Sequence, residues 1–186
     1  MREKLTTLLR RLLAGRKTLF VPGCFNAMSA RVLDQVGFPA IYMSGYGTSL
    51  SLTGLPDAGL ATMSEMVANA RYIAAAIQVP LIADADNGYG NAINVIRTVR
   101  EYIGAGVAAI HIEDQVAPKR GGHVAGREVI ALDEAVGKIR AAVAARGLPI
   151  SAIVRRQGNL LVDQRLDETR RRLGVETIVQ RDAPRA

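Results

Sequence analysis

Two aspartates one residue apart, Asp84 and Asp86, follow the apolar run 80–83 and precede a glycine-rich turn. If this run is a strand, its side chains alternate between faces, so that both carboxylates point to the same side. Two ionised carboxylates this close repel each other unless a proton or a cation lies between them. The pair therefore has two interpretations: a strand end whose acids cap the next helix, or a site for Mg²⁺, which prefers oxygen ligands.

Other residues with useful chemistry also follow predicted strands. They are Ser44, Asp57, Glu113, Lys119, Arg120 and His123. A cluster of carboxylates with mobile cationic loops above it suits an anionic substrate that is held through Mg²⁺. Gly45 and Gly47 would allow backbone N–H groups to approach a substrate carboxylate closely. His111 alternates within an apolar strand, and we expect it to be a packed, hydrogen-bonded histidine rather than a ligand.

The segments that must position these residues alternate between strands and helices. Strands are predicted at 18–21, 39–43, 81–86, 107–113 and 150–154, and helices at 3–14, 27–36, 64–77, 91–103 and 132–146. This alternation predicts an α/β fold with a parallel sheet and right-handed crossovers. Residues 48–62 are predicted to form a long loop.

The polar and glycine-rich residues come after the strands, whereas the links from helix to strand carry little chemistry. This asymmetry is typical of a (β/α)₈ barrel of the TIM type, whose site lies at the carboxyl ends of its strands. A doubly wound sheet follows a similar rule. However, the chain has neither a G-x-G-x-x-G motif after its first strand nor a P-loop lysine motif, which disfavours nucleotide binding.

Composition restricts the class of protein. The chain has 186 residues, of which 49% are hydrophobic, and it has no tryptophan, which fits one α/β domain with an aliphatic core. Its one cysteine, Cys24, excludes an internal disulfide and fits a reducing, cytoplasmic compartment. We expect Cys24 to be a buried residue rather than a nucleophile. We expect neither a membrane span nor a secretory signal, because no sufficiently long apolar run occurs.

The net charge of +7 lies entirely at the two ends of the chain. Residues 1–17 hold six basic residues and one acid, and residues 155–186 hold eight arginines and five acids. The stretch between them has ten basic residues and eleven acids. Because no aromatic residues are interleaved with the basic ones, we do not expect nucleic-acid binding.

Six motifs occur in a fixed order along the chain. They are Pro22-Gly23-x-Phe25-Asn26-Ala27-x-Ser29-Ala30, Ser44-Gly45-x-Gly47, Gly54-x-Pro56-Asp57-x-Gly59, Asp84-x-Asp86-x-Gly88-Tyr89-Gly90, Glu113-Asp114-Gln115 and Pro118-Lys119-Arg120-x-Gly122-His123. Together they resemble the isocitrate lyase and phosphoenolpyruvate mutase superfamily, in particular its methylisocitrate lyase and carboxyphosphonoenolpyruvate mutase branch. The resemblance covers about residues 5–150.

The resemblance implies a (β/α)₈ barrel, a homo-oligomer, Mg²⁺ or Mn²⁺ as the cofactor, and a small carboxylic acid as the substrate. It implies that the reaction passes through the enolate of a 2-oxo acid such as pyruvate. Residue by residue, it assigns Asp84 to direct metal binding and the other acids to the metal or its water ligands. These other acids are Asp57, Asp86 and Glu113.

The resemblance also assigns roles in substrate binding and catalysis. It makes 44–47 a backbone cradle for the substrate carboxylate, formed by Ser44, Gly45 and Gly47, with Tyr46 at the mouth of the site. It makes 119–123 a gating loop and gives Lys119, His123 and Arg155 catalytic roles. The activity that it implies is a Mg²⁺-dependent carbon–carbon lyase of the methylisocitrate lyase type.

Two departures from the family pattern keep alternatives open. The lyases carry an acid/base cysteine where this chain has Gly121, which has no proton to give. Three alternatives to the lyase therefore stay open. They are decarboxylation of a 2-oxo acid such as oxaloacetate, phosphonate mutase chemistry, and a catalytically impaired barrel.

The second departure is that the family pattern is lost after residue 154. We expect an incomplete barrel of about five β/α units in residues 1–154, followed by a divergent arginine-rich tail in 155–186. The hypothesis for this tail is a truncated or out-of-frame end of a longer gene. Within it, 166–173 is predicted to be a helix and 175–179 a strand.

Overall fold

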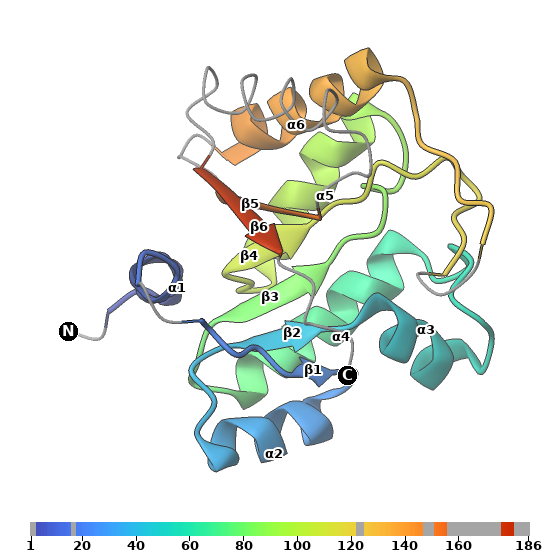
Figure 1. Ribbon diagram of the computed structural model, residues 1–186. Coiled ribbons are helices and arrows are strands. Elements are labelled where there is room, and N and C mark those ends of the chain that lie inside the picture. The colour runs from blue at the N-terminus through green and yellow to red at the C-terminus, as the bar shows by residue number, and fades with distance from the viewer. Residues whose placement is uncertain (1–2, 16–17, 122–124, 147–150, 156–175, 181–186) are drawn as a thin grey trace.

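The computed structural model describes residues 3–15, 18–121, 125–146, 151–155 and 176–180. Strands and helices alternate along the chain, and helices flank the main sheet (Figure 1). In chain order the elements are α1 (Leu5–Leu13), β1 (Gly23–Cys24), α2 (Ala27–Val36), β2 (Ile41–Met43), α3 (Gly45–Thr53), α4 (Met63–Ala76), β3 (Leu81–Asp84), α5 (Ala92–Gly104), β4 (Ala109–His111), α6 (Leu132–Arg146), β5 (Ser151–Arg155) and β6 (Glu176–Gln180).

The main sheet is parallel, with the strand order β1-β2-β3-β4. Its register pairs Ile41 with Leu81 and Asp84 with His111, so the carboxyl ends of these strands meet at one edge. Strands β5 and β6 form a second parallel pair, and β5 lies beside β4 (Figure 1). The result is the predicted incomplete (β/α) barrel. Strand β6 lies where the sequence predicts one, whereas the helix predicted at 166–173 is outside the described residues.

The side chains of β3 alternate between two apolar clusters. Leu81 and Ala83 belong to the main core, which β3 shares with α2 and α4. Ile82 faces a second cluster with Leu9 of α1 and Ala40, the residue before β2. Helix α1 therefore covers the amino ends of the strands, while Asp84, two residues after Ile82, is delivered to the same inner face at the carboxyl end.

Helices α2, α4 and α5 begin as predicted or nearly so, because a side chain satisfies their first backbone N–H groups. Asn26 caps α2, which ends at Gly37 with a left-handed φ of 95°. Helix α4 is capped by Thr62, whose hydroxyl and backbone N–H both contact Glu65. Ser64, the predicted cap, lies inside the first turn of α4 instead.

Two predicted elements are wrong. The first strand is Gly23–Cys24 and not 18–21. Six of the fifteen residues of the predicted loop at 48–62 are helical, because α3 begins soon after β2 and continues to Thr53. The Ser44 hydroxyl accepts a hydrogen bond from the Gly47 N–H at 3.2 Å and so caps α3. This cap offsets part of the low helix propensity of the two glycines in the first turn. No helix in the described part of the chain is both long and apolar enough to span a membrane.

Candidate functional site

The four acids predicted to bind a metal lie at the carboxyl edge of the main sheet. Asp84 ends β3, Glu113 follows β4 by two residues, and Asp57 comes from the connection between α3 and α4. The Glu113 N–H donates to the carbonyl oxygen of Asp86 at 2.7 Å, which joins the segments after β3 and β4. We call Asp57, Asp84, Asp86 and Glu113 the acidic centre.

Backbone N–H groups hold the Asp84 carboxylate in place. Its Oδ2 accepts a hydrogen bond from the Gly45 N–H at 3.2 Å, and its Oδ1 accepts one from the Asp86 N–H at 2.9 Å. Asp84 is 7% exposed, and a Cβ atom at position 45 would overlap its carboxylate. Glycine is therefore required at position 45 by the close approach of the α3 backbone to this acid.

The structure corrects the predicted reason for the proximity of Asp84 and Asp86. Strand β3 ends at Asp84, and Asp86 lies in a turn with a left-handed φ of 47°. The two acids are therefore not alternate residues of one strand. They are close because the turn folds the Asp86 N–H back onto the Asp84 carboxylate, an arrangement that aspartate tolerates better than most residues.

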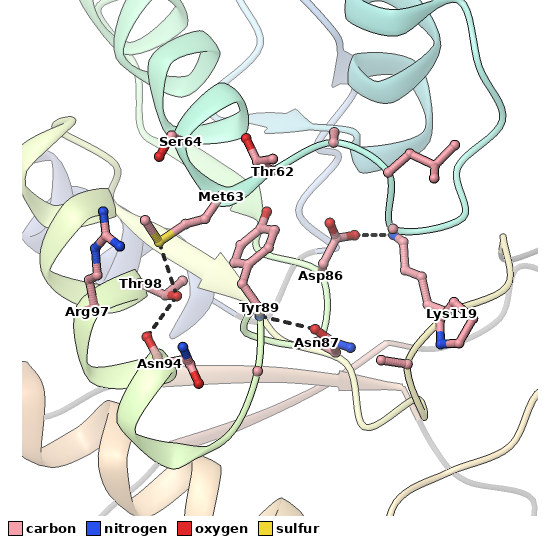
Figure 2. A pocket seen from close by; sticks show the side chains of 16 residues that line it. Thr62, Met63, Ser64, Asp86, Asn87, Tyr89, Asn94, Arg97, Thr98 and Lys119 are labelled. Carbon is pink, nitrogen blue, oxygen red and sulfur yellow. Dashed lines mark hydrogen bonds and ion pairs between the residues drawn. The ribbon is translucent and has the colours of Figure 1, made fainter.

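Lys119 lies between two of the acids. Its Nζ is 2.9 Å from Asp57 Oδ1 and also donates to Asp86 Oδ1 (Figure 2). The Lys119 side chain is 3% exposed. Lys119 itself belongs to a loop, and its side chain reaches into the acidic centre, where it acts as the counter-ion of these acids.

The charges of this pair follow from their surroundings. Burial raises the pKa of Asp86, Lys119 opposes this rise and the negative charge of Asp84 adds to it, and together these effects set the pKa at about 6. Burial lowers the pKa of Lys119, but the charge of Asp86 and the hydrogen bond with Asp57 outweigh burial, so this pKa lies above its ordinary value. Both groups are therefore charged at neutral pH and form an ion pair.

Gln115 contacts the remaining acid, although it is absent from the predicted site. Its Nε2 donates to Glu113 Oε2 at 2.6 Å, and its Oε1 accepts from the Arg120 N–H at 3.2 Å. Gln115 is buried. The spacing of two residues between Glu113 and Gln115 is the sequence signal that points to it, because such side chains share one side of an extended segment.

The donor atoms at the acidic centre fit a divalent cation. The acids offer carboxylate oxygens, the ligands that Mg²⁺ and Mn²⁺ prefer, and the raised pKa of Asp86 reflects negative charge packed into a buried site. Among the described residues, no three acids or histidines converge on one point as in a formed metal centre. The ammonium of Lys119 already holds Asp57 and Asp86.

The predicted substrate cradle is the start of α3. Ser44 is its N-cap, and Gly45, Tyr46 and Gly47 form its first turn. The amino end of a helix carries partial positive charge and attracts carboxylates. The hydrogen bond from Gly45 to Asp84 places this helix end directly against the acidic centre.

Three further residues complete the comparison with the predicted site. His123 lies outside the described residues, and Arg155 is the last residue of β5, with its side chain outside the described part. His111 is packed as expected, with its Nδ1 3.3 Å from the Tyr42 hydroxyl. Burial, and then the charge of Asp84, raise the pKa of Tyr42 above its ordinary value, so its hydroxyl stays protonated beside the acids.

A cavity of about 540 Å³ borders the acidic centre. Asp86 and Lys119 form one side of it, Asn94, Arg97 and Thr98 of α5 form the other, and the start of α4 lies above them in Figure 2. A cavity of this size accommodates a small organic acid. The ion pair is therefore reached from a cavity between the amino ends of α4 and α5.

Comparisons with known proteins agree with this geometry. The family model described as phosphoenolpyruvate phosphomutase matches residues 9–176. The chain is 55% identical to 2,3-dimethylmalate lyase of Eubacterium barkeri over 148 residues, and this aligned region covers 80% of this chain and 51% of that protein. It is 42% identical over 154 residues to 2-methylisocitrate lyase of Shewanella oneidensis, with 83% of this chain and 53% of that protein covered. It is 46% identical over 147 residues to oxaloacetate decarboxylase of Chromohalobacter salexigens, with 79% of this chain and 51% of that protein covered.

Solved structures give the same result. The crystal structure of 2,3-dimethylmalate lyase superposes with a TM-score of 0.85 at 40% identity, covering 100% of this chain and 65% of that one. Phosphonopyruvate hydrolase in complex with oxalate and Mg²⁺ superposes with a TM-score of 0.80 at 31% identity, covering 96% and 63%. The chain thus spans about half the length of these curated relatives and about two thirds of these solved structures.

Proposed function

The chain belongs to the phosphoenolpyruvate phosphomutase family, and on this premise we propose that its acidic centre serves a divalent-cation-dependent carbon–carbon lyase. The substrate is a small 2-hydroxy or 2-oxo carboxylic acid. The observation that carries the proposal is the position of Asp84, whose carboxylate is buried, fixed by two backbone N–H groups and joined directly to the amino end of α3. One site thus combines oxygen ligands for a cation with a helix end that attracts a carboxylate.

The cation would be held by the acidic centre. Asp84 offers its two oxygens, while Asp57, Asp86 and Glu113 supply further oxygens to the ion or to its waters. Mg²⁺ is the expected ion, and Mn²⁺ takes the same ligands. When bound, the ion stabilises the negative charge that develops on the oxygen of a pyruvate-like enolate during carbon–carbon cleavage.

The residues of the chain orient the substrate and balance charge. The start of α3 would receive the substrate carboxylate, because the helix dipole favours an anion there and Gly47 leaves its backbone accessible. Gly45 fixes the Asp84 carboxylate next to that position. Lys119 neutralises part of the charge of Asp57 and Asp86, so that these acids remain ionised in a buried environment.

A second reaction, decarboxylation of a 2-oxo acid such as oxaloacetate, is favoured by Gly121. The lyases that the chain resembles have an acid/base cysteine at this position, and glycine has no proton to transfer. Decarboxylation depends on the cation and the carboxylate site more than on that proton. The identity of 46% to an oxaloacetate decarboxylase supports this alternative. Phosphonate mutase chemistry and a catalytically impaired barrel remain further alternatives.

The purified protein, incubated with Mg²⁺ and 2,3-dimethylmalate, 2-methylisocitrate or oxaloacetate, decides between these reactions. Cleavage by the lyase releases pyruvate together with a second carboxylic acid, which is propionate from 2,3-dimethylmalate and succinate from 2-methylisocitrate, whereas decarboxylation of oxaloacetate releases CO₂ with pyruvate. We expect turnover that is lost in Asp84→Asn and retained in the control Asp133→Asn, which changes an exposed acid in the first turn of α6. Turnover that survives Asp84→Asn would disprove the proposed site, and no turnover with any acid would leave the impaired barrel as the function.

A further inference from the structure

Gln115 connects two parts of the site that otherwise belong to different segments. Its side-chain N–H donates to the Glu113 carboxylate at 2.6 Å, and its side-chain oxygen accepts the Arg120 backbone N–H at 3.2 Å. Arg120 adjoins Lys119, the residue whose ammonium holds Asp57 and Asp86. One buried amide thus spans from an acid of the site to the segment that carries the counter-ion.

The backbone on either side of Gln115 is anchored independently. Gln115 forms an antiparallel bridge with Val129, and the Val116 N–H donates to the Glu128 carbonyl at 3.0 Å. These bonds fix the base of the segment 116–121 but do not reach its far end. At that end, the described contacts are those of Lys119 with the acids and of Arg120 with Gln115 and Ala125.

We propose that Gln115 is a positioning residue that couples the orientation of the Glu113 carboxylate to the position of the 116–121 segment, which holds Lys119 among the acids. An amide suits this task because it offers a donor on one side and an acceptor on the other. This inference rests on the proposed function in one respect, which is that the acidic centre is the functional site that Gln115 helps to position. Displacement of Glu113 would release Arg120, and with it the tether that keeps Lys119 among the acids.

The exchange rate of the Arg120 backbone amide, measured by NMR in metal-free protein, reports this tether directly. Gln115→Ala removes both contacts, and we expect exchange at Arg120 to accelerate by about tenfold or more. Glu113→Ala should accelerate it as well, although Gln115 is still present. Glu113→Gln, which keeps an oxygen acceptor for Gln115, should leave it within about twofold of the wild-type rate.

A double variant that exchanges the side-chain types at positions 113 and 115 distinguishes coupling through Gln115 from simple support of the loop by Gln115. Gln115→Glu keeps an acceptor for Arg120 but sets a carboxylate against Glu113, so coupling predicts fast exchange at Arg120. Adding Glu113→Gln restores a donor and an acceptor in the opposite order, and exchange should slow again. If Gln115→Glu alone exchanges as slowly as the wild type, or if the double variant is no slower than Gln115→Glu, the proposal is wrong.

Two additional measurements keep the result interpretable. Protection of core amides in β3 shows whether each variant is folded, and Glu113→Ala tests the coupling with Gln115 intact if the Gln115 variants do not fold. Mn²⁺ binding, followed by electron paramagnetic resonance, tests the proposed function separately. Absence of Mn²⁺ binding by the wild type would count against the cation site, whereas the exchange rates decide the role of Gln115.

Discussion

The Lys119 ammonium lies 2.9 Å from a carboxylate oxygen of Asp57, inside the acidic centre and almost fully shielded from water. It also contacts Asp86, so one cation of the chain holds two acids that approach the site from different segments. Two buried carboxylates without a cation would repel each other and lose their hydration. Lys119 is therefore the counter-ion that stabilises this cluster of acids.

Replacing Lys119 by methionine should destabilise the metal-free protein. Removal of one partner of a buried ion pair leaves uncompensated charge, which costs about 3 kcal/mol of unfolding free energy. Urea unfolding should show this loss, and Mg²⁺ should recover part of it by supplying a cation to the same acids. Lys4→Met, at an exposed lysine, is the control for the change in net charge. Equal stability of Lys119→Met and the wild type without Mg²⁺ would contradict the counter-ion role.

Gly45→Ala should impair cation binding without unfolding the protein. The added Cβ overlaps the Asp84 carboxylate, so this acid must move away from the backbone N–H groups that orient it. Loss of an orienting contact to a metal ligand lowers affinity by about tenfold or more. Titration with Mn²⁺ measures the effect. Gly23→Ala is the matched control, because a Cβ atom there meets no atom within 4 Å; equal affinities of the two variants would count against the predicted ligand role of Asp84.

Gly121→Cys should increase carbon–carbon cleavage relative to decarboxylation. A Cβ at this position lies 3.3 Å from the Asp57 carbonyl oxygen, a tight contact that a small backbone shift relieves. The new thiol would supply the proton-transfer group that the lyases have here, and such a group contributes about a hundredfold or more to the rate. Product analysis with a 2-methylisocitrate-type acid measures this change. An equal increase in Gly121→Ala would show that the thiol is not responsible.

The Cys24 thiol should be nearly inert in the folded protein. It is 1% exposed, and burial raises its pKa to about 12 from the ordinary value of 9.0. Its thiolate fraction at pH 8 is consequently about a thousandfold lower than that of a free thiol. Reaction with a disulfide reagent should therefore be slow in buffer and fast in denaturant. Rapid labelling of the native protein would indicate that β1 opens readily or that Cys24 is accessible.

Tyr102→Phe should cost about 1–2 kcal/mol of unfolding free energy. The Tyr102 hydroxyl donates to the Asp84 carbonyl at 2.8 Å and lies 3.2 Å from the Tyr89 hydroxyl, and its residue is 1% exposed. Its removal leaves a buried carbonyl oxygen without this donor at the end of β3. Tyr72→Phe, at a residue that is 70% exposed, should change stability by less than about 0.5 kcal/mol. Similar effects of the two substitutions in thermal unfolding would refute the importance of this contact.

Local patterns in the sequence were sufficient to predict the alternation of elements and the edge of the sheet that carries the site. The apolar run before Asp84 predicts a strand that carries this acid at its carboxyl end, and the structure places it there. The ordered motifs also predict the family, which the match over residues 9–176 confirms. They do not predict α3, because the two glycines at its start favour a loop in the sequence pattern, although Ser44 caps the helix in the structure.

The sequence by itself determined which chemical groups the site contains, since residue types and their order after each strand are properties of the chain alone. The tertiary structure alone decided how those groups pair. Asp86 meets Asp84 through a turn rather than along a strand, Lys119 enters the acidic centre from a distant segment, and Gln115 joins Glu113 to Arg120. These pairings depend on the path of the backbone through turns and loops and on the burial of the charges, which become defined only when the chain is folded.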